Sequence, residues 1–246
     1  MKKAQLKDIL KKLEDDENYY GDFGKQFLSN SNIGTLLTDP LSLHQPQPAN
    51  SNLIKGAYFH TLVLEPEKLN RYKIIDAKTR NNNEYRELTN PEICLLQHEA
   101  DMLQALNETL MANETANGLI RDIDVEYEIP GLMELAGEWW KCKTDIKNNT
   151  QGIIVDLKTS GDITRFEQSA RNYNYDSQAF IYSSYFKMDF IFLVIDKKTK
   201  KIGIFDCSPQ FLERGKFKVE EAAEQYRLYY KDQSFDPKNY FISKTL

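Results

Sequence analysis

The stretch Gly152-Ile-Ile-Val-Asp-Leu-Lys-Thr-Ser160 decides the fold, together with Lys143-Thr-Asp-Ile146 just before it. The five residues between them, Lys147 to Gln151, are polar and turn-forming, so the flanking stretches are predicted to pair as an antiparallel hairpin. The apolar run at the start of the second stretch indicates a strand that is buried near the centre of a sheet.

Polar side chains in this hairpin are expected to gather on one face. Side chains two residues apart on a strand point the same way, so Asp156 and Lys158 lie together while Leu157 points into the core. The midpoint between Asp145 and Asp156 falls near Thr150–Gln151, inside the turn, so the two aspartates are expected close to opposite each other. Two carboxylates and an ammonium group should therefore converge at one place.

The regions around the hairpin predict helices before it and alternating strands and helices after it. Helices are expected over residues 3–16, 29–40, 52–65, 90–117, 163–172, 175–187 and 209–231. The first of two further hairpin strands is expected over 190–196 and its partner over 201–206, with another strand over 125–129. Residues 76–88 are rich in asparagine and predict a loop. This order indicates a mixed α/β (α+β) fold, a central mixed sheet flanked by helices with an N-terminal helical elaboration.

Length and composition agree with one domain. The chain has 246 residues, 41% of them hydrophobic and 28% charged. We expect a single domain over 1–246, with 1–120 mainly helical and 121–246 holding the strand meander, the central hairpin and the C-terminal helices. No apolar run approaches the roughly 20 residues of a membrane helix, and the N-terminus lacks a signal-peptide core, so we expect a cytoplasmic protein with no membrane partner.

The net charge and the cysteines argue against some kinds of protein and site. The net charge of −5 argues against a generally basic protein but leaves a local nucleic-acid groove open. Cys94, Cys142 and Cys207 are far apart and form no CxxC pair. This spacing argues against a disulfide framework and against an iron–sulfur cluster.

The Asp–Asp–Lys grouping suits phosphodiester cleavage. Paired carboxylates hold a hard cation such as Mg²⁺, for which Mn²⁺ can substitute, and the cation activates water and polarises a phosphoryl oxygen. A nearby lysine orients the water or neutralises charge in the transition state. The alternative is a solvated cross-strand ion pair, which is common for Asp-x-Lys. The apolar run that precedes Asp156 indicates a buried central strand. An Asp-x-Lys pair at the end of such a strand is costly unless it faces a cleft.

At this point the chain resembles a known family. Asp145 and Asp156-Leu-Lys158 resemble the PD-(D/E)xK nuclease pattern, and the context is similar to phage and prophage recombination exonucleases of the exonuclease VIII (RecE) type, relatives of lambda exonuclease. The similarity spans about residues 28–195. Its motifs are Leu28–Pro40, Gly56–His60, Leu64–Pro66, Lys141–Asp145, Val155–Ser160 and Tyr175–Tyr182. Thr144 stands where the family often has proline, which is not a ligand.

The resemblance implies a restriction-endonuclease-like core and a set of site residues. It implies that His60, Asp145, Asp156 and the Leu157 backbone carbonyl are metal ligands. It also implies that Lys158 is the catalytic lysine. The catalytic residues are completed by His60 and Gln178. For His60 the alternative is a core histidine whose ring is bonded to a neighbour.

Further candidates are less well defined by the sequence. Glu126 and Glu128 share a strand face, and either could supply an extra acid or be a solvated charge. Candidate DNA contacts are Ser160, Arg165, Arg171, Tyr175 and Tyr182. For the arginines helix-surface solvation is the alternative, and for Gln178 and Tyr182 it is a mixed packing face.

The function implied by the resemblance is a metal-dependent DNA exonuclease that acts on duplex ends in phage-type recombination. Such an enzyme would be bacterial or phage-encoded, with a single-strand annealing protein as partner and a ring-shaped homo-oligomer as assembly. Two alternatives stay open. One is an endonuclease or repair nuclease on the same core, and the other is a catalytically inactive DNA-binding protein.

Overall fold

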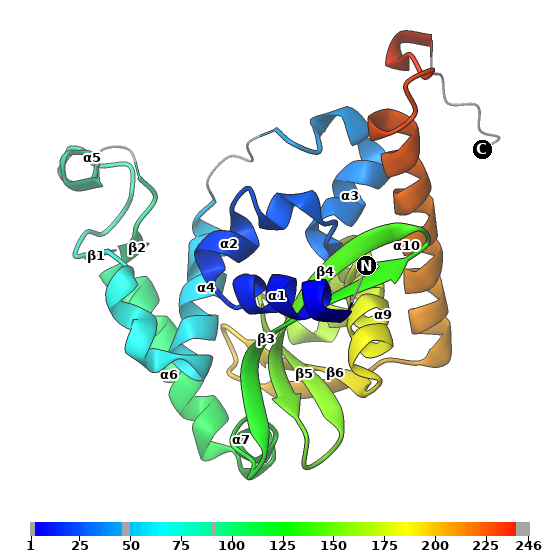
Figure 1. The fold of residues 1–246 in the computed structure, drawn as a ribbon. Helices are drawn as coiled ribbons and strands as arrows, with labels where there is room; N and C mark the ends of the chain where they lie inside the picture. The colour runs from blue at the N-terminus through cyan, green and yellow to red at the C-terminus, as the bar shows by residue number, and fades with distance from the viewer. Residues whose placement is uncertain (1–2, 46–49, 90–91, 240–246) are drawn as a thin grey trace.

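A five-stranded sheet forms the centre of the computed structural model, which describes residues 3–45, 50–89 and 92–239 (Figure 1). Its strands, in spatial order, are β3 (Val125–Leu135), β4 (Glu138–Asn148), β5 (Ile153–Ser160), β6 (Asp189–Asp196) and β7 (Ile202–Asp206). β5 and β6 are parallel, and the other neighbouring pairs are antiparallel. The predicted mixed α/β class and the β4–β5 hairpin are confirmed.

Strand β5 separates two hydrophobic cores. Ile154 packs into one core, whereas Val155 and Leu157 pack into the other, and all three side chains are fully buried. A strand that is buried on both faces reads as a continuous apolar run, which is what residues 153–155 show. Because of this alternation, Asp156 and Lys158 lie on the same side of the sheet as Ile154.

Helices cover both faces of the sheet (Figure 1). The first face is covered by α4 (Ser51–Leu64), α6 (Gln97–Ala112) and α7 (Glu114–Ile120). The second is covered by α3 (Asn30–Thr38), α8 (Phe166–Asn172), α9 (Tyr175–Phe186) and α10 (Pro209–Tyr230). Short 3-10 helices lie at Gly24–Gln26, Pro40–Ser42, Pro66–Arg71, Ile163–Arg165 and Pro237–Asn239. Among the described residues, no helix is long and apolar enough to cross a membrane.

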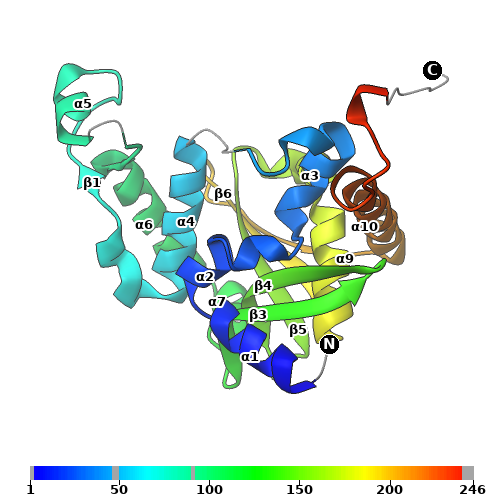
Figure 2. The ribbon, with the colours of Figure 1, turned by 45° about the horizontal axis from the view of Figure 1, so that its top comes forward.

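The N-terminal helices α1 (Lys3–Leu13) and α2 (Asp16–Tyr20) lie across the β3–β4 ribbon (Figure 2). Leu13 and Tyr19 form a small core there with Leu132 of β3. This packing holds α2 beside β4, far from it in the sequence.

The predicted loop over 76–88 is wrong in part. Helix α5 (Asn83–Thr89) forms there, in a projection that also holds the parallel pair β1 (Ile74–Ile75) and β2 (Leu95–Leu96). Tyr85 is the reason, because its ring is buried in a small cluster and its hydroxyl accepts the Cys94 N–H at 2.7 Å. One buried aromatic side chain orders a stretch whose other residues are mostly polar.

Some element boundaries also differ from expectation. The predicted start of one helix at Asn90 and Pro91 lies outside the described residues, but the helix itself, α6, begins only at Gln97, because residues 95–96 form β2. The predicted single helix is also divided at Asn113, whose side chain caps α7 by accepting the Ala116 N–H at 2.9 Å. Strand β3 continues past the predicted end at residue 129, through Pro130. Because β3 is an edge strand, a residue without an N–H is tolerated there.

Close packing between α9 and α10 gives a stability prediction. A Cβ atom on Gly215 would lie 2.0 Å from the Asp176 carbonyl oxygen, whereas one on Gly118 would meet nothing within 4 Å. We predict that Gly215→Ala lowers the free energy of unfolding by ~1–3 kcal/mol, because the helices must move apart. Gly118→Ala is the matched control in helix α7 and should stabilise by up to ~1 kcal/mol. Urea unfolding measures both, and equal effects would contradict the prediction.

Candidate active site

The candidate site lies where β4 and β5 separate. Their pairing ends at Ile146 and Val155, so Asp145 and Asp156 would form the next pair in register. Instead, the Leu157 N–H donates to Asp145 Oδ2 at 2.7 Å. In a strand the N–H and C=O of one residue point to the same side, so the Leu157 carbonyl also faces the gap.

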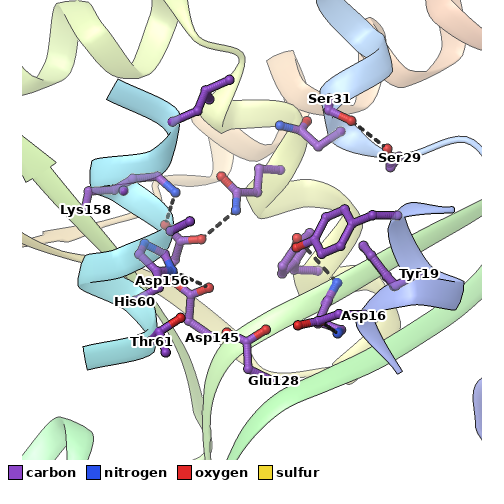
Figure 3. Close-up of a pocket in the computed structure, with 18 of the residues that line it drawn as sticks. Asp16, Tyr19, Ser29, Ser31, His60, Thr61, Glu128, Asp145, Asp156 and Lys158 are labelled. Atoms are coloured by element: carbon purple, nitrogen blue, oxygen red, sulfur yellow. Dashed lines mark hydrogen bonds and ion pairs between the residues drawn. The ribbon is translucent and has the colours of Figure 1, made fainter. Parts of the chain in front are cut away.

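A cleft of about 630 Å³ opens above this gap (Figure 3). We define the cleft by the elements that line it: α2 with Asp16, α4 with His60, β4 with Asp145, β5 with Asp156, and α9 with Gln178. The fold thus brings together side chains that are distant in sequence. Tyr175 and Tyr182 of α9 line it too, as their helical spacing predicts.

Three side chains in the cleft are close enough to share one metal ion. A nitrogen of His60 and carboxylate oxygens of Glu128 and Asp145 all lie within 4.8 Å of one another. His60 Nδ1 is 3.3 Å from Asp145 Oδ1 (Figure 3). Two carboxylates with a carbonyl nearby form an oxygen-rich donor set, so these residues fit a divalent cation.

The backbone of β3 directs Glu126 and Glu128 to different places, although the sequence leaves open which of them joins the site. Glu128 has φ +53°, which interrupts the regular pairing of β3 with β4 and brings its carboxylate into the cleft. Glu126 is exposed and accepts from Lys147 Nζ at 2.6 Å and from Asn149 Nδ2 at 2.9 Å. The sequence leaves the choice between the two glutamates open, and in the structure it is Glu128 that joins the group.

Asp156 has different partners from Asp145. Its Oδ1 accepts from Gln178 Nε2 at 2.5 Å, and its Oδ2 forms an ion pair with Lys158 Nζ (Figure 3). The Lys158 ammonium group also lies 4.8 Å from the centre of the Tyr175 ring. Asp156 therefore stands beside the His60–Glu128–Asp145 group and holds the lysine and the glutamine.

The charges in the cleft shift one another's pKa values. Burial lowers the pKa of His60, but Asp145 outweighs burial and raises it to about 9. Burial raises the pKa of Glu128 to about 8, with Asp145 adding to this effect. The pKa of Asp145 is lowered despite its burial, because His60, Lys158 and the Leu157 N–H favour the carboxylate. His60 and Glu128 therefore both hold protons near neutral pH.

The Asp156–Lys158 pair is shifted in a different way. Burial raises the pKa of Asp156 to about 6, with Lys158 opposing the rise and Asp145 adding to it. Burial lowers the pKa of Lys158, but Asp156 and Tyr175 more than offset this and keep it above its usual value. Lys158 is consequently a fixed positive charge in the cleft.

Three candidate DNA contacts do not line the cleft. Ser160 Oγ accepts the Asp162 N–H at 3.1 Å and so belongs to the turn after β5. The Arg165 side chain is 76% exposed, and its Nε lies 3.7 Å from Asp162. Arg171 is exposed on α8 and borders a second cavity. These residues follow the central strand closely in sequence, but the chain turns away from the cleft after Ser160.

Five charged residues of the cleft are absent from the predicted site: Asp16, Glu65, Arg71, Lys141 and Lys143. Strand alternation could have revealed the two lysines, because Lys141, Lys143 and Asp145 occupy alternate positions of one strand. No local pattern could have revealed Asp16 or Arg71, which reach the cleft through tertiary packing.

Comparisons with known proteins give a matching family model and a shared fold. A family model described as "PDDEXK-like domain of unknown function (DUF3799)" matches residues 41–239. The crystal structure of a protein from Eubacterium rectale described as a "putative exonuclease" has a TM-score of 0.66 at 19% identity, covering 87% of this chain and 85% of that chain, which shows a shared fold. A "phage related exonuclease" from Haemophilus somnus 129PT has a TM-score of 0.37 at 13% identity, with 81% and 93% covered. No curated protein matches the chain.

The protonated state of the ion-free group gives a pH prediction. His60 and Glu128 must lose their protons to bind a metal ion, so we predict that Mn²⁺ binding near neutral pH releases about two protons. The affinity should rise with pH and level off above about pH 9. Calorimetry in buffers of different ionisation enthalpy measures the release.

A variant of His60 separates the proton released by His60 from the one released by Glu128. His60→Gln should remove about one of the released protons and weaken Mn²⁺ binding. Unchanged proton release and unchanged affinity in this variant would exclude His60 as a ligand.

Proposed function

This chain belongs to the family of PDDEXK-like domains of unknown function (DUF3799), and on that premise we propose that it is a metal-dependent DNA nuclease. The observation that carries the proposal is the convergence of Asp145, Asp156 and Lys158 where β4 leaves β5. Burying charged groups is unfavourable unless each is paired or holds an ion. A cleft lined by buried charges is therefore a favoured place for ion and phosphate chemistry.

In the proposal, Asp145, Glu128 and His60 hold the metal ion, with the Leu157 carbonyl as a further ligand. Asp156 stays a ligand candidate, since it is the next residue in register to Asp145. A bound Mg²⁺ ion, or Mn²⁺ in its place, supplies a polarised phosphoryl oxygen and a water molecule of lowered pKa. The donor set is rich in oxygen, which supports a hard cation.

Lys158 acts in the proposal as an electrostatic group and not as a base. Its pKa stays above the usual value, so the Nζ atom keeps its proton at working pH. A fixed positive charge in a partly buried cleft stabilises the negative charge that builds on a phosphoryl group in the transition state. Asp156 and the Tyr175 ring hold this ammonium group in place, and Gln178 orients Asp156.

The substrate that we propose is a duplex DNA end, degraded exonucleolytically. The order and spacing of the motifs from residue 28 to 195 support this choice, and so does the description of the Eubacterium rectale protein. Phage-type recombination is the proposed setting, in the cytoplasm of a bacterium, with a single-strand annealing protein as partner and a homo-oligomeric ring as assembly. An endonuclease or repair nuclease on the same core is the second candidate.

Cleavage of two DNA forms tests the reaction type. We predict that the protein with Mg²⁺ degrades linear duplex DNA, leaves closed circles intact, and is inactive in EDTA. Asp156→Asn should reduce the cleavage rate by roughly a hundredfold to a thousandfold, because a buried charge of the site is lost. Cutting of circles would favour the endonuclease. If neither form is cut with any divalent ion, the DNA-binding alternative is correct.

A charge-removing variant tests the role of Lys158. Lys158→Gln should lower kcat about a hundredfold or more while DNA binding in Ca²⁺ changes little, since the charge acts mainly in the transition state. Lys201→Gln is the matched control, because this exposed lysine precedes β7 and does not line the cleft. Full activity of Lys158→Gln at neutral pH would contradict the role.

A further inference from the structure

The cleft continues from the His60–Glu128–Asp145 group along one face of β4. Lys141, Lys143 and Asp145 occupy alternate positions of this strand, and all three line the cleft. Neighbouring positions of this kind are roughly 6.8 Å apart along the strand. Two cations therefore follow the Asp145 carboxylate in a row.

One carboxylate from the N-terminal segment covers this row. Asp16 Oδ1 accepts from Lys143 Nζ at 2.7 Å, and Asp16 Oδ2 accepts from Arg71 Nη1 at 2.9 Å. The Lys143 side chain is only 4% exposed, whereas that of Asp16 is 34% exposed. A buried ammonium group and a guanidinium group thus bind one anion in the cleft, the Asp16 carboxylate.

Lys141 adds a further cation to this end of the cleft. Lys141 Nζ donates to the Tyr19 carbonyl oxygen and lies 4.3 Å from the centre of the Tyr19 ring. Burial lowers the pKa of Lys141 to about 8, and Lys143 adds to this effect. Lys143 and Arg71 thus share the Asp16 carboxylate, and Lys141 adds a third cation on the same strand face, so this end of the cleft favours an anion.

We infer that Lys143 and Arg71 form a second phosphate-binding subsite of the cleft, and that the Asp16 carboxylate occupies this subsite in the free protein. The ligand is a nucleic-acid backbone phosphate, adjacent along the strand to the phosphate that would lie at the His60–Glu128–Asp145 group. A phosphate presents anionic oxygens to lysine and arginine just as a carboxylate does. This inference rests on the proposed function, because it takes nucleic acid as the substrate.

The position of Asp16 in the chain supports the inference. Arg71 and Lys143 lie within the matched family range 41–239, whereas Asp16 precedes it. The cations therefore belong to the PDDEXK-like domain itself, and the carboxylate comes from the N-terminal helix pair laid over it. Asp16 must give up its bonds to Lys143 and Arg71 before a phosphate can take them, so it competes with the substrate.

Binding measurements without cleavage test the competition. The probe is a short fluorescent DNA duplex, followed by anisotropy in EDTA over a range of salt concentrations. Asp16→Asn should tighten binding about threefold to tenfold at low salt, since Lys143 and Arg71 become free to bind a phosphate. The slope of log K against log salt concentration should steepen by about one unit, because one more phosphate is neutralised. Asp8→Asn is the control, because Asp8 is exposed on α1 and does not line the cleft.

Paired variants show whether the effect passes through the subsite. Lys143→Gln and Arg71→Gln should each weaken binding severalfold and flatten the salt dependence, and adding Asp16→Asn to either should bring a smaller gain than in the native protein. Arg71→Gln serves where the buried Lys143 variant unfolds, and thermal melting checks all variants.

Two results would overturn the inference. Unchanged or weaker binding in a folded Asp16→Asn protein would mean that Asp16 positions Lys143 and does not compete. A gain equal to that of Asp8→Asn would reduce the effect to net charge. The binding assay involves no bond cleavage, so its outcome is independent of the nuclease assay. A protein that binds as predicted but cuts no DNA would keep the subsite and refute the proposed activity.

Discussion

The arrangement of the site depends on one hydrogen bond between neighbouring strands, from the Leu157 N–H to Asp145 Oδ2 at 2.7 Å. A buried N–H that loses its partner costs about 1–3 kcal/mol, and here a side-chain oxygen replaces the strand carbonyl. Strand β4 can therefore leave β5 beyond Ile146 without an unpaired donor. The same bond fixes the carboxylate, so that its other oxygen faces His60.

Electrostatics divide the cleft into two ends of opposite character. At the end that holds Asp145, burial raises the pKa values of Glu128 and Asp156. Keeping every carboxylate there charged is therefore costly without a bound cation. At the other end, Lys143 and Arg71 share the Asp16 carboxylate, and Lys141 donates to the Tyr19 carbonyl oxygen. A polyanion suits such a cleft, since the acidic end needs a cation to accept a phosphate while the basic end accepts one directly.

The sequence alone predicts the fold and the centre of the site where the deciding signals are local. The polar turn between β4 and β5 sets their register, in which Asp145 and Asp156 would form the next pair. The four-residue spacing of Gln178 and Tyr182 puts both on the cleft face of α9. Other features depend on geometry that no periodicity reports. The positive φ of Glu128 decides between two glutamates, and Asp16 meets Lys143 across 127 positions of the chain. The turn after Ser160 likewise directs Arg165 away.

The separation of β4 from β5 is proposed to create a metal site around Asp145. A crystal structure of the protein grown with Mn²⁺, recorded at the manganese absorption edge, tests this claim most directly. We predict an anomalous peak in contact with carboxylate oxygens of Asp145 and Glu128, close to the Leu157 carbonyl and to a ring nitrogen of His60. An anomalous map without a peak between these groups at saturating Mn²⁺, or with its peak elsewhere, would contradict the account.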